Sequence, residues 1–299
     1  MIKYDSNTIN EWNFGSSNVT KVYRNGVVRY VKIVEDYEKK YFTTVARTNG
    51  RINLRMGSGL TVANYEYIKY STDNGNTWTK VDNVNGEQVD ITVSVKVGDR
   101  VQWKGKGIRM AASTSSTNVA RFVGSTAQFD IEGNIMSLLN EDEYVGAQMT
   151  ANYTFHQLFN GCSTLINARN LILPKNVLVN SYRSTFLNCS RLLTAPKLPA
   201  TTLTNYCYYQ MFKGCTSLTA APELPATTLV NSCYRSMFNG CTRLNSIKCL
   251  ATDISATNCT NDWVTNVAAS GTFTKATSMS DWTTGINGIP SGWTVQDVQ

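Results

Sequence analysis

The sequence predicts a mainly β protein with short helices, in which a small N-terminal hairpin precedes a β-sandwich and a short repeat solenoid with a C-terminal cap. Composition supports this fold class, because charged residues make up only 16% of the 299-residue chain and much of the remainder is Thr, Ser, Asn and Gly. Short segments of alternating apolar residues fill the first half of the chain. In the second half, a motif recurs with a fixed period, which indicates stacked repeats.

Residues 1–36 predict an N-terminal hairpin that serves as an attachment module. The stretch NVTKVYRNGVVRYVKI places two alternating apolar segments around Asn25 and Gly26, and Asn-Gly is the strongest short hairpin signal. A lone hairpin is marginally stable in water, so we expect it to dock on a partner or on further copies of the chain. With WNFG before it, the segment resembles small modules of phage virion proteins, which implies contacts with other virion proteins.

The N-terminal stretch MIKYDSNTINEWNFG has neither an apolar core nor a small-residue cleavage site, so it does not read as a secretory signal. The sequence contains no run of about 18 apolar residues, so we expect no transmembrane helix. We therefore expect synthesis in a cytoplasm, no membrane insertion, and arrival at an exterior as part of a virion.

Residues 37–146 predict a β-sandwich of about seven short strands. In ITVSVKVGDRVQW, apolar residues alternate with polar ones from Ile91 to Val97, the period of a half-buried strand. Gly98 and Asp99 mark a turn into a second strand that carries Val101 and Trp103. Four further segments with strand-like patterns are RINLRM (51–56), YIKYS (67–71), TWTKV (77–81) and AQFDIEG (127–133).

The stretch STDNGNTW (71–78) matches the Asp-box pattern S-x-D-x-G-x-T-W, which recurs in the propeller blades of sialidases. A propeller of that kind needs one box per blade, together with arginines and a Tyr/Glu nucleophile pair. Because this chain has a single box, we expect a hairpin turn in which Asp73 accepts backbone N–H bonds, Gly75 supplies a positive φ and Trp78 packs beneath.

The acidic run Glu141, Asp142 and Glu143 could suggest the paired carboxylates of a glycosidase. It follows IMSLL at an expected domain junction, so we interpret it as the solvated end of a linker helix. We predict no catalytic residues and no enzymatic activity.

A repeated motif predicts a solenoid of four units over residues 147–260. FNGCSTL, FLNCSRL, FKGCTSL and FNGCTRL begin at Phe159, Phe186, Phe212 and Phe238. A period in the twenties is typical of solenoids, in which each unit is buried only against its neighbours. We expect Phe, Cys and Leu, three residues apart, to share one face of a helical turn and to stack into ladders. The aromatic residues four positions earlier extend that face (Phe155, Tyr182, Tyr208 and Tyr234), and leucine pairs six apart follow it (Leu192 and Leu198, Leu218 and Leu224, Leu244 and Leu250).

All eight cysteines lie between Cys162 and Cys259, and the motif cysteines are one unit apart. A metal site needs converging ligands, and the only histidine is His156, which we expect to be a capping or surface residue. We therefore predict buried, reduced thiols, no metal and no cofactor. For Cys207 and Cys233, which form a second column, oxidation stays open.

The stretch CYYQMFKGCTSLTAAPELPATTL resembles the BspA-type leucine-rich repeats of surface proteins of gut Bacteroidales and of phages that infect them. The resemblance covers roughly residues 150 to 299. It implies a right-handed solenoid with one strand and a short helix per coil, and a role in adhesion or recognition. The tail at 261–299 resembles the closing segment after such repeats, and we expect Trp282 and Trp293 to cover the last coil.

The formal net charge of +7 is modest, and we interpret it as spread along the chain. The densest basic run is KGKGIR (104–109), which is too sparse for a nucleic-acid groove, so we expect no nucleic-acid partner. Two near-identical units, APKLPATTLTNYCYYQMF and APELPATTLVNSCYRSMF, differ outside the expected ladders. These differences nominate five ligand-binding residues, although neutral drift gives the same pattern: Lys197, Tyr209, Gln210, Glu223 and Arg235.

We thus expect a non-enzymatic structural or recognition protein of a phage particle, in its fibre, tail or head decoration. It would be a homo-oligomer that presents the repeats to a host surface protein or glycan. The alternative is a BspA-like adhesin of a bacterial cell surface, and a second alternative is a glycan-active enzyme.

Overall fold

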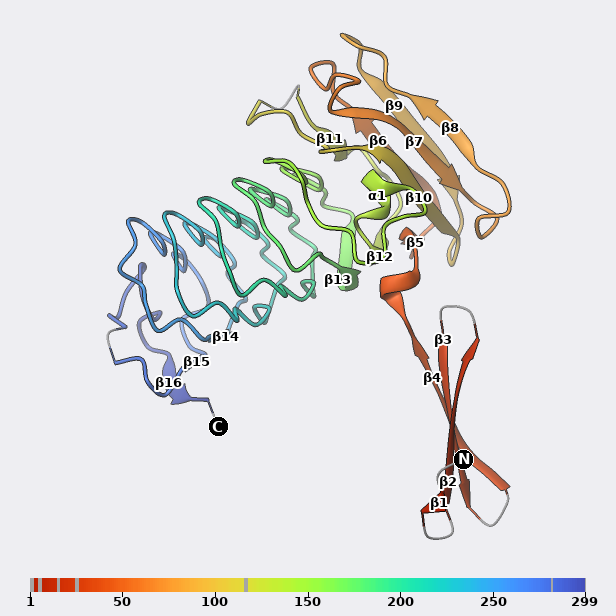
Figure 1. Cartoon of the computed structure of the whole chain (residues 1–299). Coiled ribbons are helices and arrows are strands. Elements are labelled where there is room, and N and C mark those ends of the chain that lie inside the picture. The colour runs from red at the N-terminus through yellow and green to blue at the C-terminus, as the bar shows by residue number, and fades with distance from the viewer. Residues whose placement is uncertain are drawn as a thin grey trace.

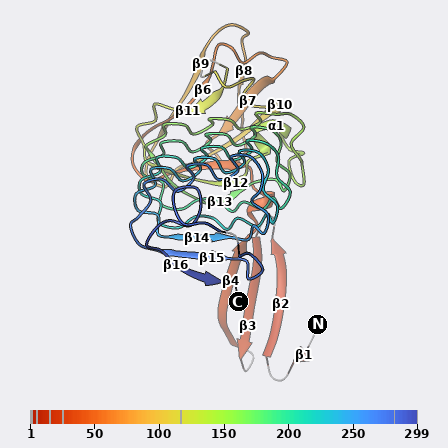
Figure 2. The same cartoon turned by 90° about the vertical axis from the view of Figure 1, so that its left-hand side faces the viewer.

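The computed structural model describes residues 3–4, 7–14, 17–24, 27–115, 118–280 and 282–298, and their side chains from residue 36 onward. The chain is mainly β, with several open sheets and very little helix (Figures 1 and 2). Its elements are β1 (Lys3–Tyr4), β2 (Asn7–Phe14), β3 (Ser17–Arg24), β4 (Val27–Glu35), η1 (Tyr37–Lys39), β5 (Phe42–Ala46), β6 (Gly50–Met56), β7 (Tyr65–Ser71), β8 (Thr79–Asp82), β9 (Val89–Val95), β10 (Arg100–Gly107), β11 (Ala120–Phe122), β12 (Phe129–Asn134), α1 (Ser137–Asn140), β13 (Leu165–Ile172), β14 (Ser246–Cys249), β15 (Thr272–Lys275) and β16 (Thr294–Asp297).

The N-terminal strands form a sheet of their own. β1, β2, β3 and β4 pair in sequence order, and each pair is antiparallel. The pairing of β3 with β4 confirms the two strands predicted around Asn25 and Gly26, which themselves lie outside the described residues. β1 and β2 were not predicted from the sequence. Figure 1 shows this sheet extending away from the rest of the chain, beyond η1.

The next part consists of two packed sheets, with strand orders β13-β12-β5-β10-β7-β8 and β11-β6-β9. The turn at Gly98 and Asp99 leads from β9 in the smaller sheet to β10 in the larger one, so these two strands do not pair. Ring contacts join the inner faces, with Trp103 of β10 lying 5.4 Å from Phe122 of β11 between ring centroids. The predicted strands are present, and β5 and β11 add to them.

One prediction in this region was wrong. Ile91, Val93 and Val95 are buried as expected, whereas Val97 lies beyond the end of β9 and is 66% exposed. The chain has already begun its turn there, because Gly98 donates its N–H to the carbonyl of Ala46.

Successive coils follow from residue 153, and their backbone bonding alternates. The N–H groups of Tyr206, Tyr208, Gln210, Phe212 and Gly214 donate to carbonyls of the next coil, at 2.8 to 3.1 Å. The intervening N–H groups donate within the same coil, to the carbonyl three residues back, as in Met211 to Tyr208. An α-helix would direct every N–H to the carbonyl four residues back. The predicted helical turn is therefore wrong, and the described residues after α1 contain no helix.

Left-handed backbone conformations recur at every fourth residue and produce this alternation. In one coil they fall at Tyr206, Gln210 and Gly214, with φ of 59°, 55° and 74°. The third such position is Gly161, Gly214 or Gly240 in three of the coils, and Asn188 with φ of 58° in the fourth. Asn tolerates this conformation better than most residues, which explains its substitution for Gly in the motif.

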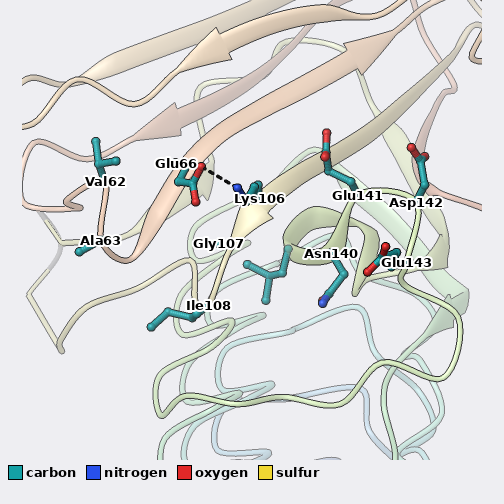
Figure 3. A pocket seen from close by; sticks show the side chains of 11 residues that line it. Val62, Ala63, Glu66, Lys106, Gly107, Ile108, Asn140, Glu141, Asp142 and Glu143 are labelled. Carbon is teal, nitrogen blue, oxygen red and sulfur yellow. Dashed lines mark ion pairs between the residues drawn. The ribbon is translucent and has the colours of Figure 1, made fainter.

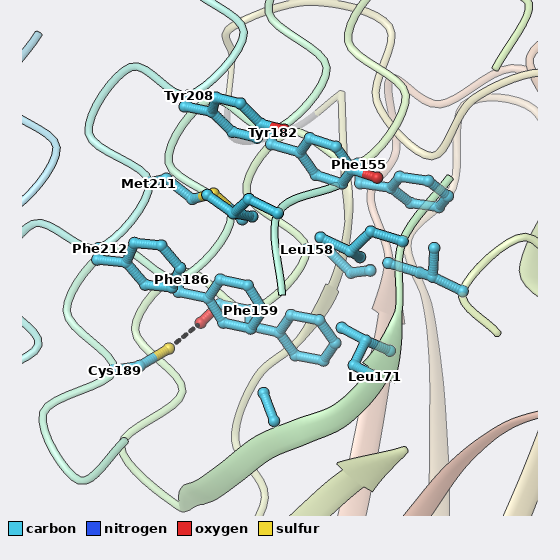
Figure 4. Close-up of a cluster of buried hydrophobic side chains, with 14 of the residues drawn as sticks. Phe155, Leu158, Phe159, Leu171, Tyr182, Phe186, Cys189, Tyr208, Met211 and Phe212 are labelled. Carbon is cyan, nitrogen blue, oxygen red and sulfur yellow. Dashed lines mark hydrogen bonds between the residues drawn. The ribbon is translucent and has the colours of Figure 1, made fainter. Parts of the chain in front are cut away.

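Two columns of stacked aromatic rings fill the inside of the coils (Figure 4). One column runs through the motif phenylalanines, with ring centroids 5.2 to 5.9 Å apart (Phe159, Phe186, Phe212 and Phe238). The other runs through the preceding aromatic positions at 5.7 to 6.1 Å (Phe155, Tyr182, Tyr208 and Tyr234). Stacking of like residues was predicted from the period, and it is confirmed.

The packed sheets and the coils share one core. Phe122 of β11 stacks on Phe159 at 5.3 Å, which continues the phenylalanine column into the sheets. β13, which belongs to the first coil, pairs in parallel with β12. The boundary proposed at residue 146 thus coincides with no break in packing or hydrogen bonding.

The C-terminal residues cover the other end of the stack. The turn pattern continues beyond the fourth unit, with left-handed residues at Asn258, Asp262 and Asn266. Trp263 stacks on Tyr234 at 6.4 Å, and Trp282 stacks on Trp263 at 5.5 Å. Trp282 and Trp293 are 9% and 7% exposed, as expected for residues that cover the last coil.

β14, β15 and β16 form a parallel sheet at this end (Figure 2). The prediction that Leu250 repeats Leu224 was wrong, because Leu224 bridges to Cys249. The last unit is one residue out of step with its predecessor, so Ile247 and Cys249 are buried there and Leu250 is half-buried.

The glycines at left-handed positions allow a prediction about the free energy of unfolding. A Cβ at Gly161 would meet nothing within 4 Å, whereas a Cβ at Gly214 would contact the side-chain oxygen of Asn188. We expect Gly161→Ala to lower the free energy of unfolding by about 1–2 kcal/mol through backbone strain alone, and Gly214→Ala to lower it further. Chemical denaturation of both variants, and of Gly214→Ala combined with Asn188→Gly, tests this. If Asn188→Gly gives no recovery, the contact is not the cause.

Candidate recognition surfaces

The Asp box closes the hairpin between β7 and β8, as predicted. The Asp73 carboxylate accepts bonds from the backbone N–H of Thr77 at 2.9 Å, from the Thr77 hydroxyl at 2.6 Å and from the Ser71 hydroxyl at 2.7 Å. These hydrogen bonds lower the pKa of Asp73 to about 2. Gly75 has φ of 86°, and the Trp78 indole N–H donates to its carbonyl. The box is therefore built as a turn.

Trp78 also helps to hold Lys104 at the junction with α1. The Lys104 side chain is 9% exposed, and its Nζ lies 4.3 Å from the Trp78 ring centroid and 2.8 Å from an Asp142 oxygen. Tyr41 donates its hydroxyl to the same carboxylate. Lys106 pairs with Glu66 and Arg109 donates to the side chain of Asn64. All three basic side chains of KGKGIR therefore contact other residues of the chain, and they do not form a free basic patch.

A pocket of about 500 Å³ lies beside this junction and contains the acidic run (Figure 3). Asp142 and Glu143 are exposed, as expected for a solvated helix end, whereas Glu141 is half-buried. Glu141 accepts a bond from Lys69 at 2.6 Å, and Asp142 accepts one from Lys104. Partial burial opposes ionisation, but bonds from Lys69 and Tyr67 keep the pKa of Glu141 below its usual value, and Lys104 and Tyr41 do the same for Asp142. A general acid needs a raised pKa, so these carboxyls are not set up for that task.

The eight cysteines are free and buried, as predicted for the four motif thiols, and Cys207 and Cys233, for which oxidation stayed open, are not joined. Three motif thiols donate to the carbonyl of the phenylalanine in the preceding coil: Cys189 to Phe159, Cys215 to Phe186 and Cys241 to Phe212, at 3.0 to 3.1 Å. Burial raises the pKa of every thiol, to about 11 for Cys162 and about 12 for Cys207. These thiols are structural hydrogen-bond donors within the core.

His156 was expected to be a capping or surface residue, and the surface alternative was wrong. His156 is 1% exposed, and its Nδ1 lies 2.7 Å from the carbonyl of Arg183 in the next coil. Burial lowers the pKa of His156 to about 4, so the neutral ring donates through Nδ1. His156 and Arg183 each stand three positions before a motif phenylalanine, so the coil period places them in line.

The structure divides the five predicted ligand-binding residues between different surfaces. Lys197 and Glu223 are exposed and line a groove of about 480 Å³ with Pro196, Pro199, Pro222 and Pro225. Glu223 also pairs with Lys248 at 3.1 Å. Tyr209, Gln210 and Arg235 belong to the turn-rich side of the coils, and no contact joins them to this groove.

Tyr209 is the centre of a column of cationic and aromatic side chains. The guanidinium carbon of Arg183 lies 4.6 Å from the Tyr209 ring centroid, and that of Arg235 lies 5.8 Å from it. The ring of Tyr206 meets Tyr209 edge-on at 6.1 Å. Arg183, Tyr209, Gln210 and Arg235 are half-buried. Ser236 replaces Gln210 in the next unit and is only 7% exposed. The substitution of Gln210 by Ser236 therefore does not lie on the exposed surface of that unit.

The net charge is concentrated on the coils, and the expectation that it is spread along the chain was wrong. Residues 147–260 contain nine Lys and Arg and two Asp and Glu, a formal net charge of +7 that equals that of the whole chain. The remaining residues are balanced. Sequence reasoning missed Arg183 as a site residue, although the same period that identified Tyr209 and Arg235 leads to it.

No group of His, Cys, Asp and Glu that could hold a metal ion occurs among the described residues. Within the same residues, no helix has the length and hydrophobicity needed to cross a membrane. Comparison of the chain with family models, curated proteins and solved structures gave no match.

The Asp box predicts a pH-dependent contribution to stability. Because the pKa of Asp73 is about 2 in the folded chain and roughly 3.9 when unfolded, its stabilisation is present above about pH 5 and is lost as the pH falls through 2. We expect Asp73→Asn to lower the melting temperature at pH 7, by an amount that shrinks as the pH falls from 5 to 2.5. Thermal unfolding of both proteins across this range tests it. A constant difference would contradict the role of the ionised carboxylate.

The burial of the thiols leads to a prediction about their rate of alkylation. At pH 8 we expect alkylation of all eight cysteines to be slow in the folded protein and complete after denaturation, because buried thiols with raised pKa values form little thiolate. A Ser hydroxyl at position 215 would have the Phe186 carbonyl as its partner, which the sequence analysis did not foresee. We therefore expect Cys215→Ser to cost about 1 kcal/mol, near the lower end of the range for a buried hydroxyl. Fast labelling of Cys189, Cys215 or Cys241 would contradict the ladder.

Proposed function

We propose that this chain is a non-enzymatic structural and recognition protein of a phage particle. Its N-terminal sheet would attach it to other virion proteins, and a β-sandwich would carry a BspA-like leucine-rich repeat solenoid with a C-terminal cap. One observation carries the proposal: the chain divides into a single body with a continuous core and a separate sheet that pairs with no other described strand. Such a division suits a protein that is held at one end and displays the other.

The N-terminal sheet supports attachment. β4 is nine residues long and pairs only with β3 among the described strands, so its other edge offers unpaired backbone groups. Exposed strand edges are templates for pairing with another chain. The partner would be another virion protein or a further copy of this chain, in keeping with a homo-oligomer.

The coils support display. Five backbone hydrogen bonds join each pair of consecutive turn segments from Tyr153 to Thr265, and stacked rings fill the space inside them. Side chains on the outside are consequently held in rows with a fixed spacing. Rigid placement of surface groups lowers the entropic cost of binding.

The paired carboxyls favour this function over the glycan-active enzyme. Glu141 and Asp142 accept bonds from lysines and have lowered pKa values, and the Asp box uses its carboxylate within the turn. The bacterial cell-surface adhesin is the remaining alternative, and it would attach the same body to a cell envelope instead of a particle.

The test compares the full chain with a variant that lacks residues 1–36. Because the core begins at Phe42, we expect the variant to fold with an unchanged melting temperature but to be absent from purified particles, where the full chain has a fixed copy number. Quantitative mass spectrometry of particles and of host envelope fractions gives both readouts. Incorporation of the truncated chain at normal copy number would contradict the attachment role. Recovery of the full chain only with the envelope would favour the adhesin.

A further inference from the structure

We propose that the column of Arg183, Tyr209 and Arg235, here called the basic column, binds an acidic glycan whose sugars carry carboxylate or sulfate groups. The inference rests on the recognition role proposed above and names the class of ligand. It also selects one surface of the coils over the proline-lined groove.

The basic column carries positive charge that no described acidic side chain neutralises. No Asp or Glu of the described residues forms an ion pair with Arg183 or Arg235, although both residues are half-buried. The proline-lined groove also holds a lysine without an ion pair to any described carboxylate, Lys197, but the carboxylate of Glu223 lines the same groove and disfavours an anionic ligand there. With a net charge of +7 on residues 147–260, an anionic ligand is attracted to the coils and finds two guanidinium groups there that no described carboxylate neutralises.

The geometry of the basic column also suits an anionic ligand. Arg183, Tyr209 and Arg235 belong to three consecutive coils, so the Tyr209 ring holds the two guanidinium groups in place by cation–π contact. The Nη1 of Arg183 also lies 3.4 Å from the Asn180 side-chain oxygen. Planar guanidinium groups held in this way are arranged to bind carboxylate or sulfate oxygens in a bidentate manner.

The surroundings favour a glycan over a nucleic acid. Arginines from the coils on either side lie over the Tyr209 ring, so it offers no free face on which a nucleobase could stack, as single-stranded nucleic acids require. No helix of the coils is present to enter a major groove. Half-exposed Tyr206 and Gln210 beside the column supply hydroxyl and amide groups that suit sugar hydroxyls.

The test uses the full chain and immobilised polymers. The probes are a carboxylated polysaccharide (polygalacturonate), a sulfated one (dextran sulfate), neutral dextran and single-stranded DNA, each over a range of salt concentrations. We expect binding to one or both acidic polysaccharides, with the stronger of the two identifying the anionic group. Neutral dextran should not bind, and DNA should bind more weakly than the preferred polysaccharide.

Matched variants locate the site. We expect Arg183→Gln with Arg235→Gln to weaken binding by roughly tenfold or more, as loss of charge-assisted hydrogen bonds implies. Arg191→Gln with Arg243→Gln removes the same charge from exposed positions of the same coils and should change binding less than about threefold. If the first variant folds poorly, Arg183→Lys with Arg235→Lys keeps the charge and should still weaken binding through loss of the bidentate geometry.

Three results would overturn the inference: no binding to either acidic polysaccharide, equal losses in the two double Gln variants, or tighter binding to DNA. None of them bears on assembly. Particles that contain the Arg183→Gln and Arg235→Gln chain should have the normal copy number, whereas failure of the proposed function would appear in the deletion of residues 1–36.

Discussion

The alternation of backbone hydrogen bonds in the coils is the constraint on which the rest of the structure depends. Every second N–H group bonds to the next coil, and the groups between them close turns within their own coil. This arrangement satisfies the buried backbone of the turn segments without a helix. It also sets the distance between coils, which places aromatic rings 5.2 to 6.1 Å apart and brings the thiols of Cys189, Cys215 and Cys241 to a carbonyl of the preceding coil. This alternation of hydrogen bonds requires a left-handed residue at every fourth position of the turn segments.

The same register that orders the core also orders the surface. The residue three positions before each motif phenylalanine is His156, Arg183, Tyr209 and Arg235 in turn. His156 is buried and its ring is neutral. Arg183, Tyr209 and Arg235 form the basic column. Tyr209 separates two arginines that would repel each other if they were in adjacent coils. A stack of this kind can thus accumulate positive charge along one row while its core stays apolar.

Sequence reasoning succeeded where a pattern maps directly onto a contact. The period of the phenylalanines predicted their stacking, the apolar alternation of residues 91–95 predicted β9, and the Asp box predicted its turn. It failed where two local structures share a pattern. Spacings of three and four residues fit an α-helix, but left-handed Tyr206 and Gln210 give the same inward-facing positions without one. β5 and β11 were missed because FTTVA and ARF are too short and too irregular to signal strands. The basic column was found only in part, since Arg183 lies in a unit less similar in sequence to the other two.

The two ends of the stack explain why the chain is organised as it is. A coil buries its face only against a neighbour, so the first and last coils each leave an apolar face that must be covered. At the first coil, Phe122 stacks on Phe159 and β12 pairs with β13, so the packed sheets act as the cover. At the last, Trp263, Trp282 and the parallel strands β14, β15 and β16 do so. Residues 42–293 therefore share one core and are expected to unfold as one cooperative unit, and the sheet of β1 to β4, which pairs with none of it, is left free to bind elsewhere.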